Sequence, residues 1–434
     1  MSFYQKELET MSQDEIKHIQ TERLKKIIKY VYEKNPVYRK KMDEKGIKPQ
    51  DVKSLDDLQF LPFMDKEDLR KAYPFGMCCV DEREIREVHM SSGSTGTPVV
   101  NAYTENDLKQ WSECVARCYA MAGLKPGDKI QITPSFGLFN GGFGFYHGAR
   151  AYGLFVVPTG AGNTRRQIKL LNDFKVDAIG AVVSYALRII EYMEENNIPE
   201  LPYLKIGMFG AETFSDSMRE RIQNYLGIEA FDIYGMTETG GVGTTGMDCP
   251  AHNGIHVWED HYILEIIDPQ TGEQLPDGEE GEVVFTSLTR EGVPVIRFRT
   301  RDITRVISRK KCDCGRTHTR IDRIKGRLDD MIIVKGVNFY PKQVEQALME
   351  IPGVKNHYQI VIEEIDGIKD VRINVEAEPW VTGYMVEKHL KEVLGFSPKG
   401  DVYPPGTLQR FEGKQKRVFN YNPMKNDKPE KNIT

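Results

Sequence analysis

The segment SSGSTGTP at residues 91–98 combines hydroxyl side chains with two glycines, as a phosphate-binding loop requires. Glycine lets backbone N–H groups approach an oxyanion closely and converge on it. The loop carries no lysine, because Thr97 follows Gly96 where the familiar nucleoside-triphosphate loop places its own cation. Since such stretches are often simple connectors, a phosphate site here requires a positive charge from elsewhere in the chain.

A second segment, FDIYGMTETGG at residues 231–241, carries groups suited to a nucleotide. Tyr234 offers a ring for stacking on a purine, and Thr237 and Glu238 offer oxygen ligands for Mg²⁺ and phosphate. In the segment RFRTRDI, Asp302 could accept hydrogen bonds from ribose hydroxyls. The competing interpretations are a strand end with a glycine turn for the first segment and a surface salt-bridge cluster for the second.

Two cysteine-containing segments, KKCDCGRTH and DCPAHNGIH, carry the ligand types of a structural zinc site. Such a site takes four nitrogen or sulfur ligands, commonly as short-spaced pairs from two segments. The predicted ligand set is Cys249, His256, Cys312 and Cys314. His252 and His318 compete with His256 for the fourth position, and ordinary reduced cysteines beside a hairpin are the alternative interpretation.

The elements that must position these groups follow an alternating pattern. From Lys129 to about residue 235, short β-rich runs alternate with amphipathic segments, which predicts βαβ units and a largely parallel sheet. Closer strands and turn signals between about 255 and 325 predict a mostly antiparallel subdomain. After residue 330 the pattern restarts as a small α+β domain. The first 75 residues are predicted to be helical, with one apolar face formed by Leu24, Ile27, Ile28 and Val31.

Length and charge narrow the class of protein. A chain of 434 residues suggests two or three domains, and a net charge of −5 gives no basic field for nucleic acid. No apolar stretch has the length of a membrane span, and the N-terminus lacks the apolar core of a signal peptide. Seven cysteines argue against a disulfide framework. We therefore expect a soluble cytoplasmic protein, with Cys78, Cys79, Cys114 and Cys118 as core or surface thiols.

Five segments, taken in order along the chain, resemble the phenylacetate-CoA ligase family of the adenylate-forming acyl-CoA ligase superfamily. The resemblance covers nearly the whole chain and implies an α/β fold. Its large N-terminal adenylation domain, residues 1–328, would combine a mostly parallel sheet with an antiparallel subdomain, and residues 329–434 would form a small mobile α+β domain. The five segments are SSGSTGTP, FDIYGMTETGG, RFRTRDI, GRLDDMIIVKGVNFYP and EGKQKR.

The resemblance also implies a reaction. A carboxylate and ATP would give an acyl-AMP and pyrophosphate, and a coenzyme A thiol would then displace AMP, with Mg²⁺ assisting. The implied catalytic residues are Lys414, Glu238, Thr237 and Arg327, with Lys416 as the alternative lysine and Asp329 as the hinge. The implied ATP- and CoA-binding residues are Ser91, Ser92, Gly93, Ser94, Thr95, Gly96, Gly210, Ala211, Glu212, Asp232, Tyr234, Gly235, Met236, Asp302 and Gly336. The same cysteine pattern occurs in zinc-containing members of this family, so the resemblance also implies a structural zinc.

The aromatic, glycine-rich segment PSFGLFNGGFGFYHG lies where the family builds its acyl pocket. Its expected pocket residues are Phe136, Phe139, Phe145 and Tyr146, which favours an aryl or arylacetic acid; a core position is the alternative for each of them. The sequence departs from the family at Thr97 and Lys335, and YHGARAYG lacks an acidic residue after Ala149, which leaves the acid unidentified.

Two other functions remain open at the level of sequence. The chain could adenylate a coenzyme or load a carrier protein without using CoA, or it could be a nucleotide-binding regulator without catalysis. The presence of Glu238 and Lys414, which the reaction would need, argues against a regulator without catalysis. The expected partners are an aromatic carboxylic acid, ATP and CoA, with no nucleic acid and no membrane, and a homodimer is left open.

Overall fold

The computed structural model describes residues 2–91, 97–212, 215–330, 332–334, 337–365, 368–395, 398–410 and 417–421. The chain divides into two compact units. The N-terminal unit comprises Met1–Val182, Pro199–Ala211 and Gly227–Ile324. The C-terminal unit comprises Val183–Ile198, Glu212–Leu226 and Lys325–Thr434.

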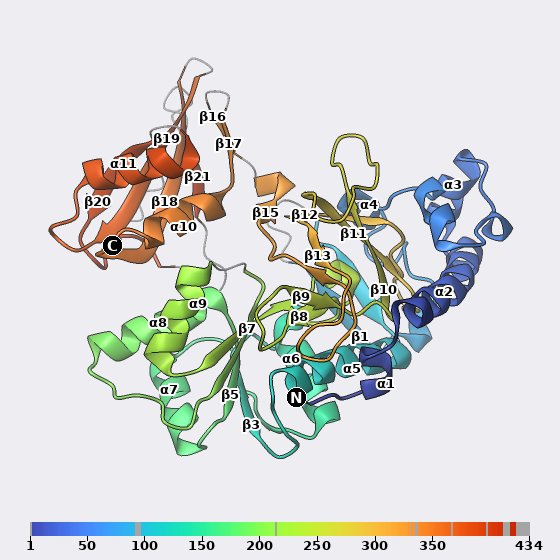
Figure 1. Cartoon of the computed structure of the whole chain (residues 1–434), viewed down its shortest axis with the longest axis horizontal. Helices are drawn as coiled ribbons and strands as arrows, with labels where there is room; N and C mark the ends of the chain where they lie inside the picture. The colour runs from blue at the N-terminus through green and yellow to red at the C-terminus, as the bar shows by residue number, and fades with distance from the viewer. Residues whose placement is uncertain are drawn as a thin grey trace. The chain divides into compact units, whose positions relative to one another are not determined.

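A nine-stranded sheet dominates the described part of the N-terminal unit, in the order β13-β14-β9-β8-β7-β6-β5-β3-β4. Five strands pair in parallel: β3 (Lys129–Ile132), β4 (Phe155–Val157), β5 (Ala178–Val182), β6 (Ile206–Gly210) and β7 (Glu229–Tyr234). Four extend it in antiparallel fashion: β8 (Gly246–Asp248), β9 (Ile255–Val257), β13 (Val306–Ser308) and β14 (Arg320–Ile321). The predicted parallel sheet is therefore confirmed (Figure 1).

Glycines in helix α6 (Asn140–Tyr152) allow it to lie close to helix α5 (Glu105–Met121). A Cβ atom at Gly144 would meet the Trp111 ring at 2.5 Å, and one at Gly148 would meet Val115 at 2.4 Å. Trp111 and Val115 are fully buried in the core beside the sheet. Helix α7 (Thr164–Asp173) completes the helices of this region. The glycine-rich sequence thus serves helix packing.

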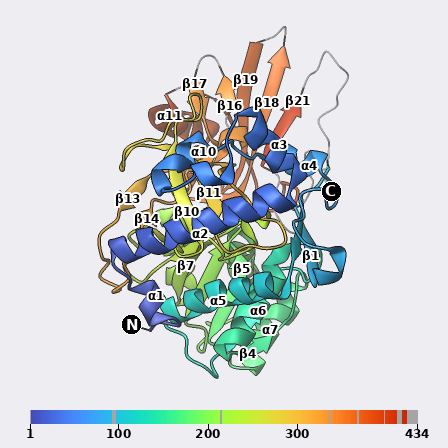
Figure 2. The ribbon, with the colours of Figure 1, turned by 90° about the vertical axis from the view of Figure 1, so that its right-hand side faces the viewer.

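A second, antiparallel sheet contains β10 (Tyr262–Ile267), β11 (Gly281–Ser287) and β12 (Phe298–Thr304), as the turn signals predicted. Helix α2 (Gln13–Lys34) runs beside β10 (Figure 2), and the Gln20 amide donates to the Tyr262 carbonyl at 3.1 Å. The predicted apolar face of α2 is buried in the same core as Ile263. The other elements of the N-terminal unit are α1 (Lys6–Glu9), α3 (Pro36–Glu44), α4 (Lys66–Lys71), β1 (Glu87–Met90), β2 (Val100–Tyr103) and the 3₁₀ turns η1 (Pro49–Asp51), η2 (Leu55–Phe60), η3 (Glu82–Glu84) and η4 (Thr237–Thr239).

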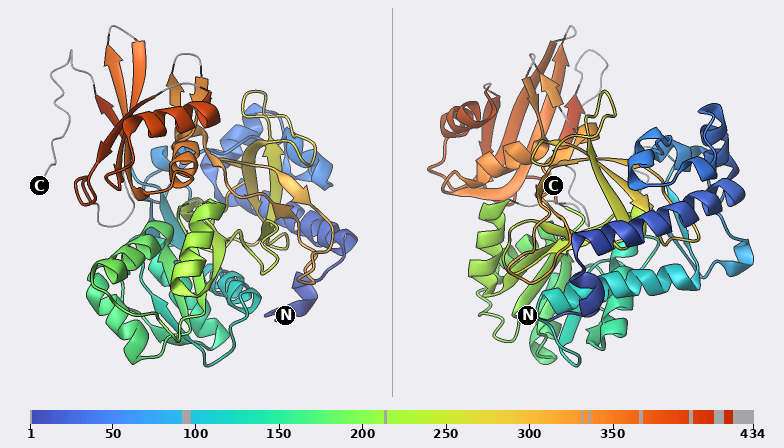
Figure 3. Two further views of the ribbon diagram at one scale, coloured as in Figure 1. Left: turned by 60° about the vertical axis from the view of Figure 1, so that its left-hand side comes forward. Right: turned by 45° about the vertical axis from the view of Figure 1, so that its right-hand side comes forward.

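The C-terminal unit contains the small α+β domain. Its sheet has the order β20-β19-β18-β21, and helices α10 and α11 lie together on one face of it (Figure 3). Buried Val344, Leu348, Ile360 and Leu390 join the helices to the strands. The elements are η5 (Leu328–Asp330), β16 (Ile332–Val334), β17 (Val337–Phe339), α10 (Pro341–Met349), β18 (Val354–Ile365), β19 (Ile368–Ala377), α11 (Gly383–Leu394), β20 (Lys399–Tyr403) and β21 (Val418–Tyr421).

Helices α8 (Val183–Glu195) and α9 (Asp216–Leu226) also belong to the C-terminal unit. The His357 imidazole lies 3.0 Å from Glu191, and Arg221 donates to the Asn356 side chain at 2.8 Å. These contacts join both helices to β18. The boundary at residues 328 and 329 stays a prediction. Within the described residues, no helix combines the length and apolar character needed to cross a membrane.

Candidate active site

The end of β7 brings together the tyrosine and the aspartate that the sequence suggested for nucleotide binding. The Tyr234 hydroxyl donates to Asp302 Oδ2 at 2.7 Å, although the two residues are far apart in sequence. Tyr234 is the last residue of β7, and Asp302 lies in β12. Gly235 follows, and a Cβ atom there would lie 2.1 Å from the Gly241 carbonyl oxygen, so only glycine fits this turn. An aromatic ring and a carboxylate are therefore held together beside the turn η4.

Turn η4 presents Thr237 and Glu238 next to two residues that the sequence analysis missed. The Asn140 amide donates to Thr237 Oγ1 at 2.8 Å, and Lys66 Nζ lies 3.3 Å from Glu238 Oε1. Lys66 lies in a segment that shares the family resemblance, LPFMDKEDLRKAYPFG, but its partner is too distant in sequence to infer. Asn140 links the start of α6 to the predicted phosphate-binding threonine. This carboxylate is therefore already paired with a cation.

The hydroxyl/glycine loop connects β1 to β2. Ser91 closes the hairpin at one end: its N–H donates to the Val99 carbonyl and its hydroxyl accepts from the Val99 N–H, each at 2.9 Å. Ser92, Gly93, Ser94, Thr95 and Gly96 lie outside the described residues.

The other predicted nucleotide-binding residues lie in or directly after β6 and β7, or in the C-terminal unit. Gly210 ends β6, and Ala211 follows with a positive φ of 65°. Glu212, in the C-terminal unit, accepts from the Ser184 backbone N–H at 2.9 Å. The Asp232 N–H donates to Asp248 Oδ1 at 2.7 Å, and the Met236 carbonyl accepts from the Gly241 N–H at 2.8 Å.

The residues expected to act from the C-terminal unit are described only in part. Arg327 and Asp329 lie beside each other, with 3.9 Å between guanidinium nitrogen and carboxylate oxygen, and Asp329 is 61% exposed. Gly336, Lys335, Lys414 and Lys416 lie outside the described residues. Their roles remain predictions from the resemblance.

Aromatic side chains gather around α6, although one expected member lies elsewhere. The Phe136 ring is 5.5 Å from Phe143 and 6.1 Å from Tyr146, and Phe139 is 52% exposed. Phe145, by contrast, lies in the core, where its ring would meet a Cβ atom at Gly180 at 3.1 Å. The buried Phe145 ring lies against β5, and its expected role in the acyl pocket stays a prediction. Phe143 lies beside Phe136.

A partly buried acid–histidine cluster adjoins these rings. Glu87 accepts from His147 at 2.9 Å and lies 3.3 Å from His89, and the His89 ring contacts Phe143. Burial opposes the charge on Glu87, but the hydrogen bonds from His147 and His89 outweigh it and lower the Glu87 pKa to about 2. The sequence carried no signal for this cluster, because the β1 strand and α6 are distant in the chain.

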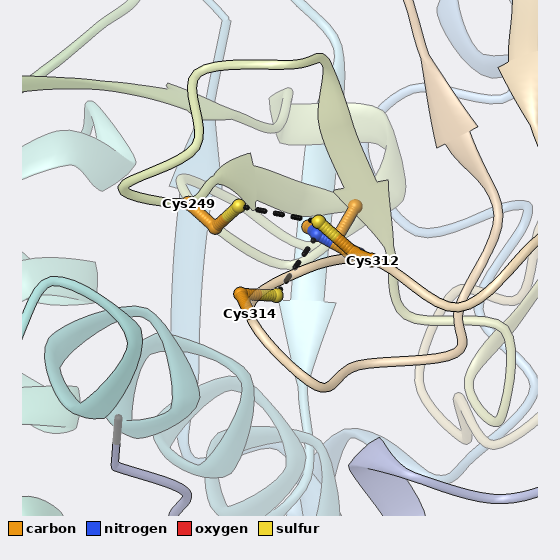
Figure 4. A group of neighbouring side chains, drawn as sticks. Cys249, Cys312 and Cys314 are labelled. Carbon is orange, nitrogen blue, oxygen red and sulfur yellow. Dashed lines mark hydrogen bonds between the residues drawn. The ribbon is translucent and has the colours of Figure 1, made fainter.

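The four predicted zinc ligands converge on one point, and Figure 4 shows the three cysteines among them. The ligand atoms of Cys249, His256, Cys312 and Cys314 all lie within 4.8 Å of one another, and all four side chains are buried. The Cys249 and Cys312 sulfurs are 3.7 Å apart, and His256 Nε2 is 3.4 Å from the Cys314 sulfur. Three sulfurs and one imidazole nitrogen match the donor set of a closed zinc site.

Local structure selects His256 over the two competing histidines. His252 hydrogen-bonds to Asp248 at 3.0 Å, and His318 accepts from the Glu259 N–H at 3.0 Å. Gly315, with φ of 83°, turns the chain directly after Cys314, and its N–H donates to the Cys312 carbonyl at 2.8 Å. Hydrogen bonds from Cys249 and His256 lower the pKa of the Cys314 thiol, which favours the thiolate that metal binding needs. The donor set therefore fits zinc.

Comparison with known families matches both parts of the chain. The family described as AMP-binding enzyme matches residues 7–289, and the family described as AMP-binding enzyme C-terminal domain matches residues 336–422. Phenylacetate-coenzyme A ligase from Thermus thermophilus is 40% identical over 96% of this chain and 99% of its own length. The ligase of the same name from Aromatoleum evansii is 42% identical, covering 96% of this chain and 97% of its own.

A solved structure shares the fold over nearly the same length. The crystal structure of 2-hydroxyisobutyryl-CoA ligase in the postadenylation state, in complex with 2-HIB-AMP, gives a TM-score of 0.90 at 28% identity and covers 96% of this chain and 91% of that chain. The same ligase has been solved in an open conformation and in the thioesterification state, each with 2-HIB-AMP and CoA. The α/β fold expected from the resemblance is confirmed.

Proposed function

The chain belongs to the phenylacetate-CoA ligase family of AMP-binding enzymes, and we propose that it joins an aryl carboxylic acid of the phenylacetate kind to coenzyme A. The activity is a two-step, ATP-dependent ligation. In the first step a carboxylate oxygen attacks the α-phosphorus, so that a new C–O–P linkage forms and pyrophosphate leaves. In the second step the CoA sulfur attacks the acyl carbon, the thiol proton is lost, and AMP leaves.

The observation that carries this proposal is the Tyr234–Asp302 hydrogen bond beside η4. The tyrosine ring would stack on adenine, and the second oxygen of Asp302 would accept from a ribose hydroxyl. Thr237 and Glu238 follow within four residues, so nucleoside and phosphate groups would be bound along one short segment. Preorganised donors and charges of this kind stabilise the transition state of phosphate chemistry.

Magnesium fits this segment through the oxygen donors of Thr237 and Glu238. Mg²⁺ binds carboxylate oxygens readily and commonly shares them with substrate phosphates. When bound, it would neutralise charge that develops on the phosphates. Glu238 would hold it, and the Asn140 amide would orient Thr237 through the 2.8 Å hydrogen bond.

Zinc would be held by Cys249, His256, Cys312 and Cys314 and would serve structure rather than chemistry. The four ligand atoms lie within 4.8 Å of one another and the side chains are buried. A closed four-ligand site leaves no position for a substrate. Bound zinc would stabilise β9 and the loop that carries Cys312 and Cys314.

The two steps would need different positions of residues after Asp329. Lys414 would bring a cation to the α-phosphate in the first step, with Lys416 as the alternative. After rotation at Asp329, Gly336 would leave room for the pantetheine arm. The separate states in which 2-hydroxyisobutyryl-CoA ligase has been solved support this proposal. Lys414→Ala should abolish acyl-AMP formation yet retain thioester formation from supplied acyl-AMP.

The aromatic rings around α6 support an aryl substrate. Phe136, Phe143 and Tyr146 lie edge to face, an arrangement that also suits a bound phenyl ring. A panel of aryl and aliphatic acids, scored by pyrophosphate release with and without CoA, tests the assignment. Arylacetic acids should outperform short aliphatic acids, and CoA should accelerate AMP release. An equal rate of AMP release with and without CoA would favour the alternative, which is adenylation of a coenzyme or loading of a carrier protein.

The cellular setting is also part of the proposal. All seven cysteines are free thiols, which supports a reducing, cytoplasmic location. Light scattering of the purified protein tests whether the chain forms a homodimer, which the sequence leaves open.

A further inference from the structure

Helix α4 carries two cationic side chains, Lys66 and Arg70, which contact Glu238 and Thr97 respectively. The Asp65 side chain caps this helix by accepting from the backbone N–H groups of Glu67 and Asp68 at 2.9 and 3.0 Å. Lys66 and Arg70 are four residues apart, so their side chains leave the same side of the helix. One reaches η4, and the other reaches the end of the loop.

Lys66 contacts the predicted phosphate- and metal-binding carboxylate directly. Its Nζ lies 3.3 Å from Glu238 Oε1, and the Glu238 side chain is only 8% exposed. A bare carboxylate at this depth would repel a triphosphate, because charges interact strongly where little water screens them. Lys66 cancels that charge, and its own side chain, at 30% exposed, remains accessible.

Arg70 ties the same helix to the loop. Its Nε donates to the Thr97 carbonyl at 3.2 Å, directly after the loop residues that would grip phosphate. The helix is itself fixed, because the buried Met64 donates to the Arg297 carbonyl at 3.2 Å and accepts from the Arg299 N–H at 2.8 Å. Met64 therefore fastens α4 to β12, the strand that carries Asp302.

We propose that Lys66 is a phosphate-binding residue, which neutralises Glu238 in the empty site and shares its charge with the β- and γ-phosphates when ATP binds. This inference rests on the proposed nucleotide function. Lysine suits the task, since its ammonium is a compact charge on a flexible stem and can bridge two anionic groups. The triphosphate would thus have a counter-charge within the N-terminal unit, independent of Lys414.

Isothermal titration of the full chain with a non-hydrolysable ATP analogue and with AMP, both with Mg²⁺, tests Lys66. The variant Lys66→Met should bind the analogue about tenfold or more weakly, and AMP within about twofold of the wild type, because AMP lacks the β- and γ-phosphates. Lys66→Arg should recover most of the analogue affinity. Lys71→Met, which removes the same charge from an exposed position on the same helix, is the matched control and should bind both nucleotides normally.

Three results would overturn the inference. The first is an unchanged affinity of Lys66→Met for the analogue. The second is an equal loss of affinity for the analogue and for AMP in Lys66→Met. The third is a loss of analogue affinity in Lys71→Met that equals the loss in Lys66→Met. Failure of the wild-type protein to bind either nucleotide would count against the nucleotide function itself, and the inference would fall with it. Circular dichroism of each variant shows whether any loss of binding comes from unfolding.

Discussion

At the scale of single residues, the predictable features are those with a distinctive local pattern. Tyr234, Asp302 and the predicted zinc ligands carry side-chain chemistry that motif spacing reveals, and the structure brings each set together. Lys66 and Asn140 could not be predicted, because each meets its partner across more than 90 residues. The pocket role expected of Phe145 stays a prediction, because composition alone does not tell which face of α6 a ring occupies, and this ring is buried against β5.

The Tyr234 hydroxyl makes a testable contribution to ATP binding. Tyr234→Phe keeps the ring but removes the hydrogen bond that orients Asp302, and hydrogen bonds to charged groups are worth about 1.5–3 kcal/mol. We expect the KM for ATP to rise about tenfold with little change in kcat, since ground state and transition state lose the same contact. Steady-state kinetics measures both constants. Tyr203→Phe, at an exposed tyrosine, should leave both unchanged; an unaltered KM in Tyr234→Phe would contradict the assignment.

At the scale of elements, the close approach of α5 and α6 depends on glycine. An alanine at position 148 would place its Cβ 2.4 Å from Val115. Overpacking costs about 1–3 kcal/mol, and exceeds the gain of about 1 kcal/mol in helix propensity. Gly148→Ala should therefore lower the free energy of unfolding measured in urea. Gly137→Ala is the control, because its Cβ would have its nearest neighbour at 3.7 Å; equal stability of the two variants would refute tight packing.

Glu191 on α8 gives the C-terminal unit a pH-dependent stability. Burial opposes its charge, but hydrogen bonding to His357 outweighs this and lowers the Glu191 pKa to about 2. A carboxyl whose pKa falls on folding stabilises the native state above its ordinary pKa, and that contribution is lost as the pH falls toward the folded value. The shift corresponds to at most about 3 kcal/mol.

The variant Glu191→Gln measures this contribution. It should be less stable than the wild type in urea near neutral pH, and the difference should shrink as the pH falls below about 4.5. Glu195→Gln alters an exposed carboxylate on the same helix, 57% exposed, and should have little effect at any pH. A stability difference that is the same at low and neutral pH would show that the Glu191 charge contributes nothing.

The predicted zinc ligands join β9 to the loop that carries Cys312 and Cys314, so we expect bound zinc to support the fold. Elemental analysis of purified protein should find about one zinc per chain. Cys312→Ser should lose the metal and lower Tm, and a strong chelator should lower the Tm of the wild type. Cys78→Ser, at a half-buried cysteine outside the cluster, should keep its zinc. Wild-type protein that contains no zinc, or a zinc content that is unchanged in Cys312→Ser, would show that these residues do not form a zinc site.

At the scale of the whole molecule, the sequence predicted the class of fold better than its division into units. Alternating strand and helix patterns anticipated the parallel sheet, and closely spaced strands anticipated the antiparallel one. The grouping of α8 and α9 with the C-terminal unit was not foreseen, because it depends on contacts such as Arg221 with Asn356. Local periodicity specifies an element and its buried face; it does not specify a partner 135 residues away.

The central claim, that one chain first makes an acyl-AMP and then passes the acyl group to CoA, is tested most directly in a single-turnover experiment. Enzyme in excess is mixed with radiolabelled phenylacetate and Mg-ATP, and CoA is added after the first phase. We expect acyl-AMP and pyrophosphate to form together without CoA, and acyl-AMP to disappear at the rate at which acyl-CoA and AMP appear. Acyl-CoA formation without an acyl-AMP intermediate, or acyl-AMP that persists after CoA is added, would contradict the account.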